Sequence, residues 1–390
     1  MTAQTLPTAA VPLLPEKFGG WFAKRGWAPR PHQLELLAKA EAGRSVLLIA
    51  PTGAGKTLAG FLPSLVDLAR NDLAKEPKKP GMPVFGPHTL YVSPLKALAV
   101  DIHRNLEMPV AEMGLPIRLE TRTGDTPVYK RQRQKLDPPD MLLTTPEQVA
   151  LLIASRDARR FFGRLKTMIF DELHSLVVSK RGDLLSLGLA RLRELAPGLK
   201  TIGLSATVAD PDDLCAWLVP QKPGEERRLA DKIVVEGGAP PVITIIEAAD
   251  TRVPWQGHTA LYALPALYEA IKAHKTTLVF VNTRWQAELI FRELWRVNDD
   301  SLEIALHHGS LDRGQRRKVE AAMAEGKLRA VVATSTLDLG IDWGDVDLVA
   351  HVGAPKGASR LAQRIGRANH RMDEPSVGLL VPANRFEVLE

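Results

Sequence analysis

The sequence predicts an α/β fold of two tandem units, each a mostly parallel sheet flanked by helices. Three observations predict it. Short β-branched and Leu-rich runs alternate with longer amphipathic segments, which is typical of parallel strands covered on both faces. This series occurs twice, and a Pro- and Gly-rich stretch over residues 220–258 separates the two occurrences. The 390 residues, 45% of them hydrophobic, provide enough apolar side chains for two packed cores.

The expected strands of the first unit lie at 45–50, 89–93, 117–121, 140–144, 166–170 and 200–204. Those of the second lie near 276–281, 302–306, 328–333, 346–351 and 377–382, with helices at 284–297 and 312–325 between them. We place the first domain at 1–225, with a flexible lead-in over 1–18 and a surface loop at 74–88. The second domain covers 226–390 and opens with a β-rich linker at 226–258.

Charge and cysteine content narrow the classes of function. The chain has 51 Lys and Arg against 45 Asp and Glu, a net charge of +6, which suits a polyanionic partner without requiring one. Cys215 is the single cysteine, so an intrachain disulfide, a Cys-based zinc site and a Cys-ligated iron–sulfur cluster are excluded. Prolines interrupt the N-terminal apolar residues, so we expect no signal peptide or membrane span, and a cytoplasmic protein.

The stretch SVLLIAPTGAGKTLAG indicates a strand, a phosphate-binding loop and a helix. Glycines permit the strained turn and the close approach of backbone N–H groups to a polyphosphate. The lysine would neutralise the β and γ phosphates, and the threonine hydroxyl is placed to ligate Mg²⁺. Ala50 stands where the general pattern has its first glycine. The expected nucleotide-binding residues are Thr52, Gly53, Gly55, Lys56 and Thr57.

A second chemical signal is IFDELH, where an apolar strand ends in two adjacent acids. Asp171 suits a Mg²⁺ ligand, while Glu172 suits a base that accepts a proton from the attacking water. A solvated acidic turn is the alternative for an isolated pair, but the preceding phosphate-binding loop favours catalysis. Taken alone, His174 is typical of a structural histidine; beside this acid pair it is a candidate link between the state of the nucleotide and the neighbouring strands.

The order of these motifs resembles that of superfamily 2 helicases. APTGAGKT, DELH and SAT at 205–207 resemble motifs I, II and III. LVFVNTR at 278–284, HHGSL at 307–311, ATSTLDLGID at 333–342 and QRIGRANHR at 363–371 resemble motifs IV to VI. The resemblance covers nearly the whole chain. It implies two RecA-like domains that close around ATP and Mg²⁺.

The resemblance also assigns residues around the base. Gln33, in RPHQ, corresponds to the glutamine that reads adenine, and its amide has the donors and acceptors to pair with the adenine edge. The aromatic residue that stacks on the base stays open, with four candidates: Phe18, Trp21, Phe22 and Trp27.

Motif VI supplies positive charge to the transferred phosphate. Arg367 matches the arginine finger. A second arginine is usual three residues later, where this chain has His370, so Arg364 and Arg371 are alternatives. Two motif V positions near the nucleotide sugar and the domain cleft are Gly340 and Asp342.

The resemblance places nucleic-acid contacts in loops that grip phosphates without reading bases. SPLKAL, RTGDT and TTPEQ resemble the strand-tracking motifs of the first domain, with Lys96, Gly124 and Thr145 as leading positions. The corresponding residues of the second domain are Thr283, Arg284, His308, Gly309 and Thr334. Turn formation or helix capping is the plain alternative for each.

DELH, QRIGRANH and the opening FxxWFAxRGWxPRPHQ are similar to the large helicase-related (Lhr) family, and within it to the ligase-associated DExH-box branch. That family implies 3′-to-5′ translocation on single-stranded DNA and unwinding of DNA or RNA:DNA duplexes. It further implies DNA repair in the nucleoid, with DNA ligase and nuclease partners. A winged-helix domain and further modules are usual, so we expect this chain to be the motor core.

Three other functions stay open. A DEAD-box RNA helicase shares the two-domain core, but its DEAD tetrad and HRIGRTGR-like motif VI differ from DELH and QRIGRANHR. A translocase that moves along duplex without separating strands shares every motif. A non-catalytic nucleic-acid-binding module is disfavoured because the residues expected to catalyse hydrolysis are all present, namely Lys56, Thr57, Asp171, Glu172 and Arg367.

Overall fold

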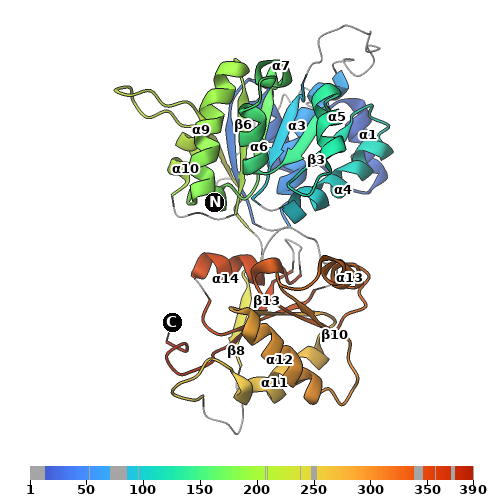
Figure 1. Ribbon diagram of the computed structural model, residues 1–390, viewed down its shortest axis with the longest axis vertical. Helices are drawn as coiled ribbons and strands as arrows, with labels where there is room; N and C mark the ends of the chain where they lie inside the picture. The colour runs from blue at the N-terminus through green and yellow to red at the C-terminus, as the bar shows by residue number, and fades with distance from the viewer. Residues whose placement is uncertain are drawn as a thin grey trace, which may run out of the picture. The chain divides into compact units, whose positions relative to one another are not determined.

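A computed structural model describes residues 14–51, 53–70, 86–94, 96–206, 208, 210–237, 239–246, 253–337, 346–355, 357–369 and 374–389. The chain passes from one unit to the next between Val235 and Glu236. Each unit has a parallel sheet with helices on its faces, as the sequence predicts, and Figure 1 labels the elements.

The first unit contains a seven-stranded sheet in the order β3-β4-β2-β5-β6-β1-β7, with every pairing parallel. Its strands are β1 Val46–Ile49, β2 Thr89–Val92, β3 Leu119–Arg122, β4 Met141–Thr144, β5 Thr167–Phe170, β6 Lys200–Ser205 and β7 Asp231–Val234. Its helices are α1 Glu16–Lys24, α2 Pro31–Glu41, α3 Lys56–Arg70, α4 Lys96–Glu112, α5 Val128–Leu136, α6 Pro146–Ile153, α7 Ala158–Phe162, α8 Leu173–Val177, α9 Lys180–Leu195 and α10 Pro211–Leu218.

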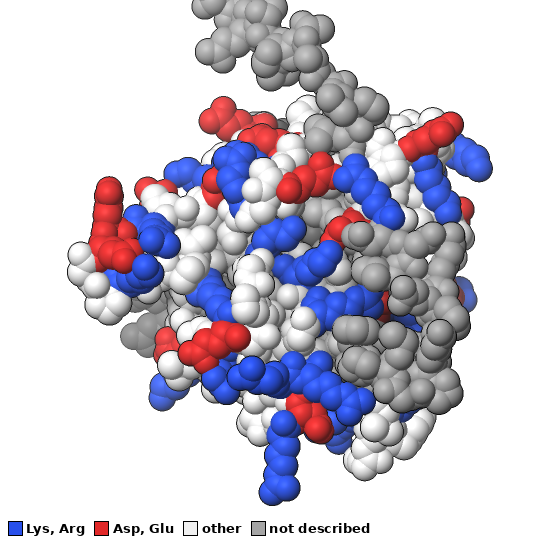
Figure 2. All heavy atoms as spheres, turned by 90° about the horizontal axis from the view of Figure 1, so that it is seen from above, with Lys and Arg blue, Asp and Glu red and all other residues white. Residues whose placement is uncertain are grey.

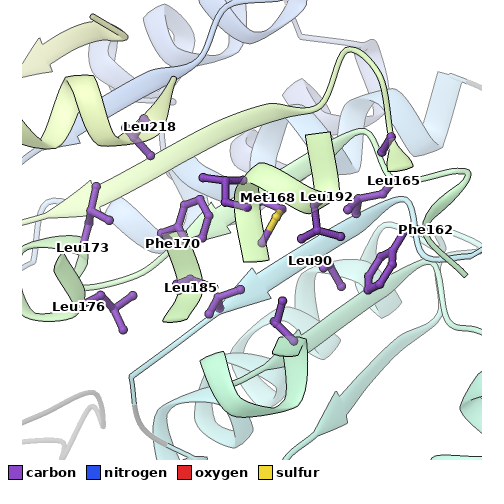
Figure 3. Close-up of a cluster of buried hydrophobic side chains, with 14 of the residues drawn as sticks. Leu90, Phe162, Leu165, Met168, Phe170, Leu173, Leu176, Leu185, Leu192 and Leu218 are labelled. Atoms are coloured by element: carbon purple, nitrogen blue, oxygen red, sulfur yellow. The ribbon is translucent and has the colours of Figure 1, made fainter. Parts of the chain in front are cut away.

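Alternation along the strands explains why both faces of this sheet are covered. Met168 and Phe170 belong to a buried cluster that includes side chains of α9 and α10, and Figure 3 shows its leucine and phenylalanine residues together. Ile169 points to the opposite face, where α3 approaches closely. A Cβ atom at Gly60 would lie 2.9 Å from Leu204 Cδ1, so the small residue permits this close packing.

The second unit contains a six-stranded parallel sheet in the order β10-β11-β9-β12-β13-β8. Its strands are β8 Val242–Ile245, β9 Thr277–Val281, β10 Ile304–His307, β11 Ala330–Ala333, β12 Leu348–Val352 and β13 Val377–Val381. Its helices are η2 Leu261–Ala263, α11 Leu264–Ala273, α12 Arg284–Arg296, α13 Arg313–Ala324, η3 Ser335–Leu337 and α14 Ala358–Ile365.

Strand β9 shows how the second core forms. Val279 and Val281 pack with side chains of α11 and α12, while Leu278 and Phe280 pack with Met323 of α13 and with residues of α14. Figure 1 shows α11 and α12 side by side on one face. The period-two pattern of a fully buried strand therefore places helices on both sides of this sheet as well.

Two details differ from the sequence-based expectations. The expected boundary lies at residue 225, whereas β7 follows it and pairs with β1 in the first sheet. The expected lead-in over 1–18 ends inside α1, which begins at Glu16 and buries Phe18. Most of the loop expected at 74–88 lies outside the described residues. No helix in the described part of the chain is long and apolar enough to cross a membrane.

Candidate functional site

The phosphate-binding loop follows β1 and leads into α3 at the carboxyl edge of the first sheet. Gly53 and Gly55 have φ values of 76° and 73°, in the left-handed region that only glycine adopts without strain. Lys56 is the first residue of α3, and its Nζ atom donates a 2.7 Å hydrogen bond to the carbonyl of Ala50. The loop is therefore closed on itself, with the lysine held across it.

Ala50 departs from the usual glycine without disturbing the loop. Its N–H donates to the carbonyl of Ser205 at 3.1 Å, and its methyl group is buried, so this residue continues β1 rather than turning the chain. Among the described residues of the loop, positive φ values occur further along, at Gly53 and Gly55. Alanine therefore fits here for a local structural reason.

Gln33 lies against this loop. Its Nε2 atom is 3.5 Å from the carbonyl of Gly55, and its Oε1 atom accepts a 2.9 Å hydrogen bond from the N–H of Arg30. The amide therefore joins the start of α2 to the loop, and its role toward adenine stays a prediction. Three aromatic candidates for stacking on the base, Phe18, Trp21 and Phe22, are buried, whereas Trp27 is exposed.

The two acids follow β5, and β6 separates this strand from β1. Asp171 is buried; the hydroxyl of Tyr91 donates to its Oδ2 atom and the N–H of Glu172 to its Oδ1 atom. Burial raises the pKa of Asp171 to about 6, and the charge of Glu172 adds to this, while Tyr91 and Lys56 oppose it. Ionising this buried carboxylate costs free energy when no cation is bound, and a bound cation would stabilise the charged form. Asp171 therefore suits a cation-binding site.

Mg²⁺ fits this donor set. The described residues contain no group of three His, Cys, Asp or Glu side chains arranged to hold a metal. Mg²⁺ in phosphoryl-transfer sites commonly uses one or two protein oxygens, with phosphates and water supplying the rest. Thr57 in α3 and the buried Asp171 are the residues that would hold it.

Glu172 and His174 form a unit beside this carboxylate. Glu172 adopts a left-handed conformation, with φ 48° and ψ 45°, and its Oε2 atom accepts no hydrogen bond from the described residues. His174 places Nε2 3.4 Å from that oxygen and Nδ1 2.9 Å from the hydroxyl of Ser205. Burial lowers the pKa of His174, and the charge of Lys56 adds to the effect, so the ring is neutral near pH 7.

The loops of the first unit that are expected to track the strand lie at the same edge, because β2, β3 and β4 run parallel to β5 in one sheet. Gly124 is exposed in a turn closed by Thr126, whose hydroxyl accepts from the N–H of Thr123 at 2.9 Å. Thr145 is buried at the start of α6. Lys96 begins α4, and its side chain lies outside the described part of the structure.

Arg181 of α9 joins two of these loops, although no sequence motif singles it out. Its Nη1 atom donates to the carbonyl of Pro94 at 2.6 Å, while Nε and Nη2 donate to the carboxylate of Glu147 at 2.5 and 3.1 Å. The guanidinium therefore ties SPLKAL to TTPEQ. A single arginine ten residues after the acid pair carries no sequence signal for such a role.

In the second unit, Thr283 and Arg284 follow β9. Thr283 caps α12, since its hydroxyl accepts a 3.1 Å hydrogen bond from the N–H of Gln286. Both residues are exposed. The capping role expected as the plain alternative for Thr283 is therefore present, and it leaves strand binding as a prediction.

The HHGS loop lies at the end of β10 and Thr334 follows β11, which lies between β10 and β9 in the sheet. His308 is buried; its Nδ1 atom accepts from the N–H of Ser310 at 3.2 Å and its Nε2 atom lies 3.3 Å from Glu288 of α12. Thr334 is buried, whereas Gly309 is exposed. Of this group, the exposed glycine is the position that a ligand reaches without rearrangement.

Arg364 lies in the core of the second unit. Its Nη1 atom donates to Nε2 of His351 at 2.5 Å, and its guanidinium lies 4.6 Å from the ring centre of Phe280. This packing favours a structural role over a second arginine finger. Arg367 follows α14 and is buried. The remaining expected nucleotide residues lie outside the described part of the chain: Thr52, Gly340, Asp342, His370 and the alternative Arg371.

The charge of the molecule is mixed on the face that Figure 2 shows, where Lys and Arg side chains gather with Asp and Glu among them. The net charge of +6 therefore does not produce a uniformly basic surface on that face. Binding to a polyanion depends on how particular loops are placed rather than on overall charge.

Comparison with known proteins matches the chain to two helicase families. The DEAD/DEAH box helicase family matches residues 30–214, and the helicase conserved C-terminal domain matches residues 261–372. The ATP-dependent helicase Lhr-Core protein 2 of Thermococcus barophilus is 38% identical, over 95% of this chain and 44% of that protein. The Lhr helicase/probable uracil glycosylase of Mycolicibacterium smegmatis is 36% identical, over 95% of this chain and 26% of that protein.

Solved structures agree as well. The Mycobacterium smegmatis helicase Lhr bound to ssDNA and AMP-PNP matches with a TM-score of 0.80 and 35% identity, over 96% of this chain and 48% of that one. The DEAD-box helicase Mss116 bound to ssRNA shares the fold, with a TM-score of 0.77 at 18% identity. The chain spans less than half the length of these curated Lhr relatives.

Proposed function

Because this chain belongs to the superfamily 2 helicases, with Lhr and Lhr-Core proteins among its relatives, we propose that it is an ATP-dependent motor that moves along single-stranded nucleic acid. In this proposal, the preferred nucleic acid is single-stranded DNA, and the motor hydrolyses ATP with Mg²⁺ as the cofactor. The ssDNA and AMP-PNP bound to the Mycobacterium smegmatis Lhr support that choice.

One observation carries the proposal. The phosphate-binding loop follows β1, the acid pair follows β5, and Ser205 ends β6, which lies between these two strands. His174 bridges from the acid pair to Ser205. A direct side-chain contact therefore connects the acid pair proposed to hydrolyse ATP to β6, a strand of the same sheet that bears the loops expected to track the nucleic-acid strand.

The residues of the first unit divide the work of hydrolysis. The backbone of the glycine loop and Lys56 bind the phosphates, while Thr57 and Asp171 would hold Mg²⁺, which would supply positive charge to the transferred group. Glu172 has a buried carboxylate oxygen without a hydrogen bond from the described residues, and it accepts the proton of the attacking water. Arg367 is the proposed arginine finger.

The finer assignment follows from the resemblance to the Lhr family. We propose 3′-to-5′ translocation, separation of DNA or RNA:DNA duplexes, and a role in DNA repair with ligase and nuclease partners. A motor of this kind binds phosphates and sugars through loops, so affinity should fall with rising salt and vary little with base sequence.

The test compares ATP turnover with single-stranded DNA, single-stranded RNA and blunt duplex, and unwinding of duplexes tailed at the 3′ or the 5′ end. Stimulation by single-stranded DNA and unwinding from a 3′ tail is the expected result. Stronger stimulation by single-stranded RNA would show that RNA, not DNA, is the preferred nucleic acid. Stimulation by blunt duplex alone would indicate a duplex translocase. Turnover unaffected by every nucleic acid would overturn the motor function.

A further inference from the structure

Trp285 differs from the other exposed tryptophans of this chain. The described residues contain four, with exposed fractions of 52% for Trp27, 64% for Trp255, 60% for Trp285 and 53% for Trp295. Three of them pack against another ring: Trp27 on Trp21, Trp255 on Phe386 and Trp295 on Phe291. Within the described part of the chain, Trp285 has no ring or cation–π partner.

The turn that carries Trp285 is held firmly. Thr283 caps α12, and the side chain of Gln286 is buried, donating to the carbonyl of His258 at 2.6 Å and accepting from the N–H of Asn282 at 3.2 Å. The buried face of α12 continues through Ala287 and Ile290. Trp285 lies outside this face, so the helix presents its ring to solvent from a fixed backbone.

Trp285 is also beside the HHGS loop. Glu288 is one turn further along α12, on the same side of the helix as Trp285. Its carboxylate lies 3.3 Å from Nε2 of His308, which precedes the exposed Gly309. The ring therefore lies at the carboxyl edge of the second sheet, among the positions expected to contact a nucleic-acid strand.

The neighbours of the ring identify its ligand. Arg284 and Thr283 are exposed next to it, and they provide a cation and a hydroxyl for phosphate oxygens. A flat aromatic ring beside phosphate-binding groups is the arrangement on which single-stranded bases stack, whatever their sequence. A purely apolar protein partner would leave the arginine charge without a counterpart.

We propose that Trp285 is a base-stacking residue of the second unit, whose ring covers the face of one base while Arg284 and Thr283 bind the adjoining phosphates. This inference rests on the proposed function, because it adds a contact to the same strand. It explains how a motor could hold a base without reading its identity, since every base offers a π face.

The test measures the affinity of the whole protein for fluorescently labelled oligo-dT and for an abasic strand of equal length. The variants are Trp285→Ala, Trp285→Phe and the control Trp295→Ala, which removes an equally exposed tryptophan from the other end of α12. We expect Trp285→Ala to weaken oligo-dT binding about tenfold, Trp285→Phe to restore most of it, and Trp295→Ala to change it less than about twofold. On the abasic strand, wild type and Trp285→Ala should bind equally.

Equal binding of oligo-dT by wild type and Trp285→Ala would overturn the proposal, as would an equal loss on the abasic strand. Thermal unfolding of each variant shows whether it is folded, and because the Trp285 side chain is exposed, the alanine variant should unfold as wild type does. If wild-type protein binds no strand at all, the proposed function fails. If wild-type protein binds single strands and the Trp285 variants bind them equally well, this inference alone fails.

Discussion

The Nδ1 atom of His174 lies 2.9 Å from the hydroxyl of Ser205, so the last residue of the DELH motif reaches the end of the neighbouring strand β6. On its other side, the same ring lies 3.4 Å from Glu172. A neutral imidazole can donate from one nitrogen and accept at the other, so one side chain connects the proposed base to the strand next to the phosphate-binding loop. This pair is the structural basis we propose for coupling hydrolysis to strand binding.

Removing the side chain of either His174 or Ser205 should uncouple ATP hydrolysis from strand binding. His174→Ala and Ser205→Ala should each lower strand-stimulated ATP turnover about two- to tenfold, the range of one net hydrogen bond, and change unstimulated turnover less. The double variant should be no worse than the more damaging single variant, because both remove the same contact. Additive losses would show that the two residues act separately. His274→Ala, remote in sequence and bound to the carbonyl of Ala270, is the control.

Replacing the two charged residues of the nucleotide site should separate binding from chemistry. Glu172→Gln should keep nucleotide affinity and lower turnover by about 10²-fold or more, since the amide cannot accept the proton. Lys56→Ala should lose affinity as well, which equilibrium binding of a fluorescent ATP analogue would measure. Glu194→Gln, an exposed change on α9, should leave both unchanged. Normal turnover in Glu172→Gln would contradict its role as the base.

Arg181 should act on the strand and not on the nucleotide. Arg181→Ala removes three hydrogen bonds that join Pro94 to Glu147, so single-stranded DNA affinity should fall about three- to tenfold while nucleotide affinity stays the same. Arg181→Lys should rescue little, because an ammonium group cannot span both loops. Arg191→Ala on the same helix is the control, since it pairs only with Glu194 among the described residues. Unchanged strand affinity in Arg181→Ala would show that the two loops keep their places without it.

The second unit should lose stability in mild acid because of His351. Burial lowers the pKa of His351 from 6.5 to about 4, and the charge of Arg364 adds to this effect. His351 therefore takes up a proton at a lower pH in the folded state than in the unfolded state. The unfolded state therefore binds more protons between pH 6.5 and pH 4, and stability falls by up to about 3 kcal/mol as the pH falls through this window. Hydrogen exchange in β9 and β12 should show this loss in wild type. His351→Gln should be less stable at neutral pH and show a weaker dependence on pH; an equal dependence would refute the assignment.

The fold was predictable because buried parallel strands are short apolar runs between turn residues. The six strands expected in the first unit and the five expected in the second, such as 200–204 and 276–281, all correspond to strands in the structure. The boundary at residue 225 could not be placed as well. β7 has alternating exposure and a sequence suited to a linker, and only its pairing with β1 assigns it to the first sheet. Local pattern carries no information on that pairing.

The site was predictable where chemistry demands residue types at fixed spacing, as in the glycine loop and the acid pair. Contacts between segments that are distant in the sequence were not predictable. Arg181 bonds to residues 34 and 87 positions away, and no spacing rule indicates such a bond. Arg364 shows the converse, since an arginine in a catalytic motif packs on Phe280 in the core. Trp285 became notable only when the structure showed that its ring lacks the partners of the other exposed tryptophans.

The most direct test of the motor function is steady-state ATP turnover of wild type and Glu172→Gln across a titration of single-stranded DNA, at two salt concentrations. We expect turnover in wild type to rise with DNA to a plateau, with a midpoint that moves to higher DNA concentration at the higher salt. In Glu172→Gln we expect almost no turnover at any DNA concentration. Turnover in wild type that is independent of DNA, or a Glu172→Gln variant that responds as wild type does, would contradict the motor function.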